Sequence, residues 1–159
     1  MKSQKVTLSI TVLVNAPATH VFKCLTDWPA QSQWMVGTVV RATKQQGKYI
    51  NGEISAFTGI GPFGFTDTMT ITTWDPPYQC SVIHTGRIVR GTGDFIVTAT
   101  SKQQSTFTWS EDFILPLGIF GRLVWPIAKP FITLGFKMSL NRFASWSEKQ
   151  KAVSGTKKP

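Results

Sequence analysis

The first residues of the chain alternate between apolar and polar side chains. The apolar side chains of this segment are Val6, Leu8, Ile10, Val12 and Val14. A period of two places all of them on one face of an extended chain, with polar side chains on the other face. This pattern is typical of an antiparallel strand that has one buried and one solvated face.

Two short helical segments are expected after this strand. Asn15-Ala16-Pro17 favours a helix start, because asparagine caps helix N-termini and proline fits the first turn. The apolar residues that follow at helical spacing are Ala18, Val21, Phe22 and Leu25. Asp27-Trp28-Pro29 interrupts this helix, and residues 30–35 are expected to form a second helical turn.

Residues 36–115 have the composition of strands, because they are rich in Thr, Val, Ile and aromatic side chains. Turn-forming residues divide this region, notably the glycines of Gly59–Gly64 and the prolines of Asp75-Pro76-Pro77. The expected strands are Val36–Lys44, Gly52–Thr58, Phe65–Trp74, Tyr78–Thr85, Thr92–Ser101 and Thr106–Leu115. Consecutive strands joined by short turns predict an antiparallel meander.

The last part of the chain returns to helical spacing. From about residue 118 to residue 149, apolar residues recur at steps of three and four, and Pro126 and Pro130 are expected to kink the first half. The residues of this stripe are Leu123, Ile127, Phe131, Leu134 and Met138. A helix of this length extends about 45 Å at 1.5 Å per residue.

Together these elements predict a single α+β domain over residues 1–150 and a disordered basic tail over residues 151–159. One strand, two short helices, six strands and one long helix fit a curved seven-stranded antiparallel sheet wrapped around the C-terminal helix. A chain of 159 residues can bury one hydrophobic core without disulfide support. Because a curved sheet and a helix do not touch everywhere, this architecture also predicts an internal cavity.

The net charge of +9 raises the question of an anionic partner. Lys and Arg are scattered along the chain and do not alternate with aromatic residues as they do in nucleic-acid-binding modules, so that no nucleic-acid partner is expected. The densest basic group is Lys149, Lys151, Lys157 and Lys158. Weak contact with an anionic membrane surface remains open.

No apolar leader precedes the first strand, and a cytoplasmic location is therefore expected. The sequence does not indicate an oligomeric state.

No metal or other cofactor is expected. Cys24 and Cys80 lie far apart and match no metal-ligand spacing. Gly59-Ile60-Gly61-Pro62-Phe63-Gly64 matches the dinucleotide-binding fingerprint in letters only, because a strand and not a helix is expected after it. We interpret this segment as a flexible hairpin loop that carries Phe63 and Phe65.

Several short motifs resemble one protein family. Val14-Asn15-Ala16-Pro17-Ala18-Thr19-His20-Val21-Phe22, followed by Leu25-Thr26-Asp27-Trp28-Pro29 and Trp34, is similar to the opening of the SRPBCC (START-like) superfamily, in its polyketide cyclase/dehydrase and lipid-transport branch. Trp74-Asp75-Pro76-Pro77, His84-Thr85-Gly86-Arg87 and Gly91 resemble the same branch, so that the resemblance covers about residues 6–146. It implies a helix-grip fold with a hydrophobic cavity, but no single activity, because members include carriers, cyclases and hydroxylase domains.

The resemblance and the apolar strand faces together favour binding or transport of a hydrophobic small molecule, either lipid-like or polyketide-like and aromatic. The ligand is expected between the sheet and the long helix. From the strand region, the residues expected to line the cavity are Phe63, Phe65, Met69, Val82, Phe95, Val97, Trp109 and Phe113. From the helix, they are Leu123, Ile127, Phe131 and Leu134.

Three ionisable residues are predicted to share the apolar side of the sheet. Strand alternation turns Asp67, His84 and Glu111 to the same side as their apolar neighbours. Because a buried carboxylate costs free energy unless it is paired, these side chains are expected to bind one another or orient a ligand. Arg87 is expected to pair with Glu111 or to hold an acidic headgroup.

Two other functions remain open. A histidine with a carboxylate suits general acid–base catalysis, so a polyketide cyclase or dehydratase that uses His84 with Glu111 or Asp67 is the first alternative. The second is a membrane-surface or regulatory module that uses the basic tail and the proline-containing helix. Residues 113–136 are apolar, but Arg122, Lys129 and three prolines argue against a membrane span. The same residues argue less strongly against a helix that lies at the membrane interface.

Overall fold

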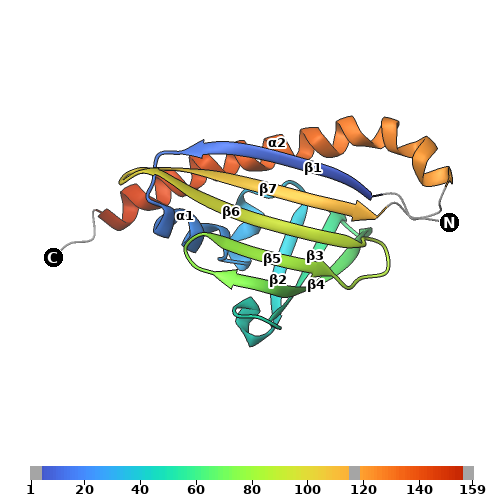
Figure 1. The fold of residues 1–159 in the computed structure, drawn as a ribbon, viewed down its shortest axis with the longest axis horizontal. Coiled ribbons are helices and arrows are strands. Elements are labelled where there is room, and N and C mark those ends of the chain that lie inside the picture. The colour runs from blue at the N-terminus through green and yellow to red at the C-terminus, as the bar shows by residue number, and fades with distance from the viewer. Residues whose placement is uncertain (1–4, 115–118, 156–159) are drawn as a thin grey trace.

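The computed structural model describes residues 5–114 and 119–155, and its central feature is one seven-stranded antiparallel sheet (Figure 1). The strands are β1 (Lys5–Val14), β2 (Thr38–Lys44), β3 (Glu53–Ile60), β4 (Phe63–Asp75), β5 (Gln79–His84), β6 (Gly91–Ser101) and β7 (Gln104–Ile114). Their order across the sheet is β1-β7-β6-β5-β4-β3-β2. The six later strands therefore form the predicted meander, and β1 pairs with its last strand.

The helices complete the predicted helix-grip fold, which the structure confirms. They are α1 (Ala18–Leu25), the short 3₁₀ helices η1 (Pro29–Gln33) and η2 (Gln45–Gly47), and α2 (Ile119–Gly155). Figure 1 shows α2 lying along the sheet beside β1, while β2 to β5 curve beneath it. Asn15 does not cap α1, because Pro17 takes the N-cap position and no side chain bonds there.

The hydrophobic core lies where α1, the sheet and the second half of α2 meet. Trp34 is fully buried at its centre. Its ring makes edge contacts with Phe107 of β7 and Phe143 of α2, with centroids 6.4 and 5.0 Å apart. Phe107 and Phe143 also contact each other, with centroids 4.9 Å apart. This aromatic cluster holds the second half of α2 against the sheet.

The first half of α2 is oriented differently from the sequence prediction. Residues of the predicted inward stripe are exposed instead, by 67% at Leu123, 68% at Ile127, 72% at Phe131 and 56% at Leu134. Trp125, Ile132 and Phe136 face the sheet in their place. The prediction was wrong because this half of the helix is apolar around most of its circumference, so spacing alone fits more than one face.

Two boundaries also differ from the sequence prediction. Gly59–Gly64 is not a long loop, because β3 continues to Ile60 and β4 begins at Phe63, which leaves Gly61 and Pro62 as the turn. Gly61 adopts a φ of 58°, which favours glycine.

The long helix also reaches further than expected. The sequence predicts a disordered tail over residues 151–159, but residues 151–155 continue α2, and residues 156–159 lie outside the described part of the chain. Pro126 and Pro130 lie inside the helix, and Figure 1 shows it bending in this first part. Within the described residues, no helix combines the length and apolar character that crossing a membrane requires.

Replacing Phe143 with alanine is expected to lower the free energy of unfolding by about 3–5 kcal/mol, because it opens a void beside Trp34 and Phe107. The same replacement at Phe131, which is on the same helix but 72% exposed, is expected to change the free energy of unfolding by less than about 0.5 kcal/mol. Urea denaturation followed by tryptophan fluorescence measures both values. A larger loss at Phe131 than at Phe143 would mean that α2 presents the opposite face to the sheet.

Candidate functional site

A cavity of about 540 Å³ lies between the sheet and the first half of α2. Its volume falls within the range of small-molecule sites. Most of the lining side chains are apolar, and those from the strands include Phe65, Met69, Val82, Phe95, Trp109 and Phe113. The cavity exists because α2 packs tightly only through its second half, while the curved sheet falls away beneath its first half.

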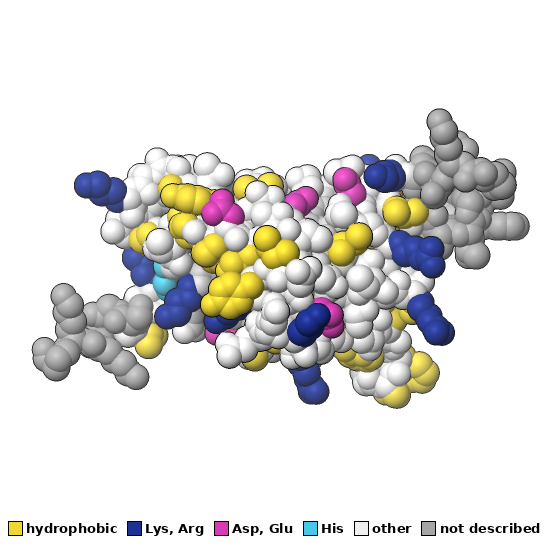
Figure 2. Space-filling view, turned by 60° about the horizontal axis from the view of Figure 1, so that its bottom comes forward, with side chains coloured by type: hydrophobic (Ala, Val, Ile, Leu, Met, Phe, Trp, Pro, Cys, Tyr) yellow, Lys and Arg dark blue, Asp and Glu magenta, His cyan; other side chains and the backbone are white. Residues whose placement is uncertain are grey.

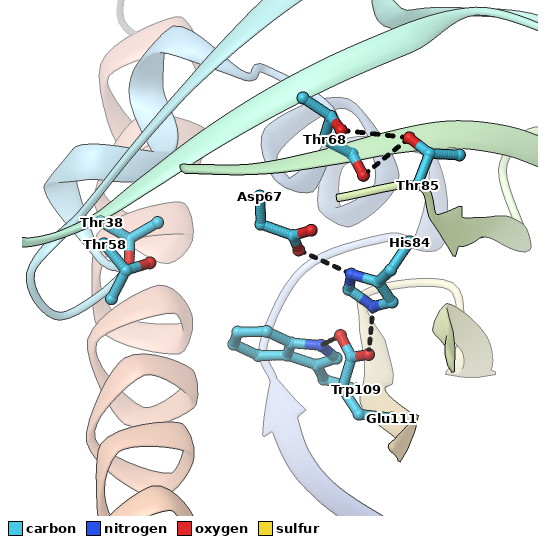
Figure 3. A network of polar contacts seen from close by, with 8 residues as sticks. All are labelled: Thr38, Thr58, Asp67, Thr68, His84, Thr85, Trp109 and Glu111. Atoms are coloured by element: carbon cyan, nitrogen blue, oxygen red, sulfur yellow. Dashed lines mark hydrogen bonds and ion pairs between the residues drawn. The ribbon is translucent and has the colours of Figure 1, made fainter. Parts of the chain in front are cut away.

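Asp67 of β4, His84 of β5 and Glu111 of β7 meet on the wall of this cavity (Figure 3). His84 Nδ1 lies 2.6 Å from Asp67 Oδ2, and His84 Nε2 lies 2.9 Å from Glu111 Oε2. Trp109 Nε1–H donates a hydrogen bond of 2.7 Å to the other oxygen of Glu111. The three ionisable side chains are each at most 9% exposed. Strand alternation therefore predicted correctly that these groups converge.

The sheet register leaves room for this contact through two glycines of β6. In the ladder, His84 pairs with Gly91 and Glu111 pairs with Gly93. A Cβ atom at Gly93 would lie only 2.8–3.0 Å from the Glu111 carboxylate. The imidazole and this carboxylate thus meet across a strand that places no side chain between them. Glycine inside a strand is the sequence signal that indicates such a close approach.

The cluster holds His84 in its charged form. Burial alone lowers the pKa of His84, but the hydrogen bonds to Asp67 and Glu111 and their negative charges more than offset this and raise it to about 9. At neutral pH the ring is therefore an imidazolium whose two N–H groups donate to the two carboxylates. Burial raises the pKa of Glu111, against the opposing effect of its bonds to His84 and Trp109.

One oxygen of the cluster keeps unused capacity to accept a hydrogen bond. Asp67 Oδ1 is buried and accepts no hydrogen bond from the described residues. Gly86 lies beside it, and a Cβ atom there would be 3.0 Å from this oxygen. An unpaired buried acceptor costs free energy. Asp67 Oδ1 therefore remains available to accept a hydrogen bond from a new donor.

A second, uncharged polar group borders the cavity away from the ionised cluster. Thr38 and Thr58 line the cavity, and their hydroxyl oxygens lie 3.0 Å apart on the paired strands β2 and β3. Figure 3 shows this pair beside α2, on the far side of the open space from His84. Ser139 also borders the cavity and accepts a hydrogen bond of 3.1 Å from the backbone of Val36. These hydroxyls are not among the residues that the sequence predicts to line the cavity.

The structure separates the predicted site residues into two groups. Those that border the cavity are Phe65, Asp67, Met69, Val82, His84, Phe95, Trp109, Glu111 and Phe113. Those that do not border it are Phe63, Arg87, Val97, Leu123, Ile127, Phe131 and Leu134. Phe63 is at the exposed hairpin, and Val97 lies inside the packed core. Ligand binding by the first group stays a prediction.

Arg87 does not pair with Glu111 as predicted. It is exposed in the segment between β5 and β6, whereas Glu111 is bonded by His84 and Trp109. Strand alternation carries no information in this segment, because the residues there are not extended in a ladder. Arg90, from the same segment, borders the cavity instead.

Metal coordination and thiolate chemistry find no support among the described residues. Among the described residues, no group of His, Cys, Asp and Glu has the arrangement of a metal site. Cys24 and Cys80 are buried and free. Burial raises the pKa of the Cys24 thiol to about 11 and that of Cys80 to about 12, so neither is a thiolate at neutral pH.

Comparison with known proteins gives a family and a set of similar folds. The family described as polyketide cyclase/dehydrase and lipid transport matches residues 4–148. No curated protein matches the chain. A solved structure of the Zhui aromatase/cyclase from Streptomyces sp. R1128 is similar, with 17% identity and a TM-score of 0.79 over 96% of this chain and 99% of that one.

Two further solved structures share the fold. A point mutant of norcoclaurine synthase from Thalictrum flavum, in complex with a transition state analogue, has 13% identity and a TM-score of 0.66 over 95% of this chain and 99% of that one. The di-domain aromatase/cyclase StfQ of the steffimycin biosynthetic pathway has 10% identity and a TM-score of 0.70, over 93% of this chain and 52% of that one. At these identities the likeness shows the fold.

Replacing Gly93 with alanine is expected to push the Glu111 carboxylate away from His84, because the new methyl group would meet it at 2.8–3.0 Å. Loss of this hydrogen bond should lower the pKa of His84 from about 9, which NMR titration of the imidazole measures. The control is Gly135→Ala on α2, which also borders the cavity but where a Cβ atom meets nothing within 4 Å. An unchanged His84 pKa in Gly93→Ala would contradict the role of this glycine.

Proposed function

The chain belongs to the polyketide cyclase/dehydrase and lipid transport family, and on this premise we propose that it catalyses cyclisation or dehydration of a polyketide-like substrate. The observation that carries the proposal is the buried Asp67–His84–Glu111 cluster on the wall of an otherwise apolar cavity. A cavity that only stored an apolar ligand would be more stable without buried charges, because their desolvation is costly. Buried ionisable groups in a cavity are typical of acid–base sites.

Asp67 and His84 have complementary roles in the proposed dehydration. Asp67 takes a proton from the carbon between a carbonyl and a carbon that bears a hydroxyl group. The C–O bond to that hydroxyl breaks, a C=C bond forms, and His84 Nδ1 turns its proton from Asp67 to the hydroxyl, which leaves as water. The proton on Asp67 then returns to His84 across the 2.6 Å hydrogen bond between them. In an aldol-type cyclisation the same pair serves as base and as acid on the carbonyl oxygen.

Glu111 has a positioning role in this proposal. It binds His84 Nε2 and is itself held by the indole N–H of Trp109, so that the imidazole ring is fixed from its far side. Its negative charge also helps keep His84 protonated and able to act as an acid.

Flat aromatic surfaces beside the cluster favour a planar, ring-forming substrate. The indole of Trp109 stacks on Phe136 of α2, with centroids 4.0 Å apart and planes 24° apart. Phe95 meets the same indole edge-on at 5.5 Å. Two similar structures are named as aromatase/cyclases, which supports a substrate of the same kind.

A β-hydroxy polyketone thioester is a suitable probe substrate, with loss of water followed by mass spectrometry. Asp67→Asn and His84→Gln are each expected to lower kcat/KM by about 100-fold or more, as removal of a general acid or base does. The activity of the wild-type protein should fall as the pH rises through about 9, because His84 then loses its acidic proton. Thr58→Val, which alters the cavity away from the cluster, is the control. Equal rates for the wild type and the two cluster variants would refute the catalytic role.

Carriage of a hydrophobic ligand is the second candidate function, and the apolar lining of the cavity favours it. In this case native mass spectrometry of the freshly purified protein should show a retained lipid-like or polyketide-like molecule, identified after solvent extraction. Asp67→Asn should retain the same molecule, because apolar burial would dominate its binding. A protein that is empty and binds no apolar fluorescent probe would contradict the carrier function.

A further inference from the structure

The outer face of the first half of α2 carries a continuous apolar stripe. Its members are Leu123, Val124, Ile127, Phe131, Leu134 and Met138, exposed by 67, 59, 68, 72, 56 and 41%. Their steps of three and four residues place them on one side of the helix, over about 22 Å of its length. Single exposed apolar residues are ordinary, but a stripe of this length is typical of an interaction surface.

The same helix closes the cavity with its opposite face. Trp125, Ile132 and Phe136 line the cavity, whereas the stripe points away from it. Packing of the protein's own core therefore does not account for the outer apolar residues. One wall of the ligand cavity is a helix that is apolar both inside and outside.

Charge along the helix indicates an anionic partner. Lys129 and Lys137 are exposed outside the stripe. At steps of four and then seven residues beyond Met138, the same face continues with Arg142 and Lys149, which are also exposed. Residues 113–147 contain no Asp or Glu. In contrast, the face drawn in Figure 2 carries acidic side chains among its Lys and Arg side chains.

We propose that this outer face of α2 docks the protein on an anionic membrane surface. The apolar stripe would enter the boundary between headgroups and acyl chains, while Arg142 and Lys149 bind lipid phosphates. An interfacial helix of this kind combines large apolar residues on one face with nearby cations. Long basic side chains reach the headgroups while their stems lie along apolar surface.

A lipid surface fits these observations better than a second copy of the chain. Each copy carries a net charge of +9 and places the same cations beside the stripe, so two copies repel each other at this face. Anionic lipid supplies both the apolar medium and the opposite charge. Docking would place the helix that closes the cavity directly against the lipid, giving an apolar ligand a short route between the bilayer and the cavity.

Vesicle flotation tests the proposal with the full chain. Vesicles of phosphatidylcholine and phosphatidylglycerol in equal amounts are expected to bind the protein, and vesicles of phosphatidylcholine alone to bind it more weakly. The double variant Ile127→Ser/Phe131→Ser should lower partitioning by about tenfold or more, since burial of one such side chain exceeds the free energy of a tenfold change. Both residues are exposed, so unfolding measured by circular dichroism should be unchanged.

Two further variants distinguish the causes. Arg142→Gln/Lys149→Gln should weaken binding to the anionic vesicles and leave the weak binding to neutral vesicles unchanged. Tyr78→Ser/Ile83→Ser removes apolar side chains of 53 and 42% exposure from the β4–β5 turn and from β5, and it should leave partitioning unchanged. Absence of binding to anionic vesicles, or equal binding by the α2 double variant and the wild type, would overturn the proposal. A concentration-dependent dimer that the α2 double variant abolishes would assign the face to a second copy instead.

Discussion

The rest of the structure depends on a mismatch in shape between a strongly curved sheet and a long helix. The aromatic cluster of Trp34, Phe107 and Phe143 holds the second half of α2 on the sheet. Beneath the first half the sheet curves away, and the side chains of Trp125 and Phe136 do not fill the gap. The cavity of about 540 Å³ is the direct result. Tight packing at one end of a helix thus leaves a space for a ligand at the other.

The ionised cluster is tolerated on the wall of this cavity because its members satisfy one another. Taking a carboxylate out of water costs several kcal/mol, and Asp67 and Glu111 offset this cost by sharing one imidazolium. Trp109 donates to the remaining oxygen of Glu111, while one oxygen of Asp67 has no hydrogen-bond partner within residues 5–114 and 119–155. The proposed acid–base step uses this oxygen of Asp67 and the imidazolium of His84.

The two proposals use opposite faces of the same helix, and neither depends on the other. Catalysis or carriage concerns the inner face, where Phe136 stacks on Trp109 beside the cluster. Membrane docking concerns the outer face around Ile127 and Phe131. They are compatible physically, because an apolar substrate partitions into lipid, and a cavity whose closing helix lies on the bilayer can take it up without passage through water.

The sequence by itself determined the element order, the antiparallel meander and the inward side of most strands. Turn residues mark where each strand ends. Within a strand, side chains alternate between two faces, so the apolar residues identify the face that is buried. That is why Asp67, His84 and Glu111 were found. Alternation says nothing about segments outside the ladder, so Arg87 was misplaced. The face of α2 that meets the sheet was decided only by tertiary packing, because a helix segment that is apolar on both sides has no preferred face of its own. Likewise, only the pairing of β6 with β7 brings Gly93 against Glu111. This contact depends on the register of the sheet, which no local sequence pattern specifies.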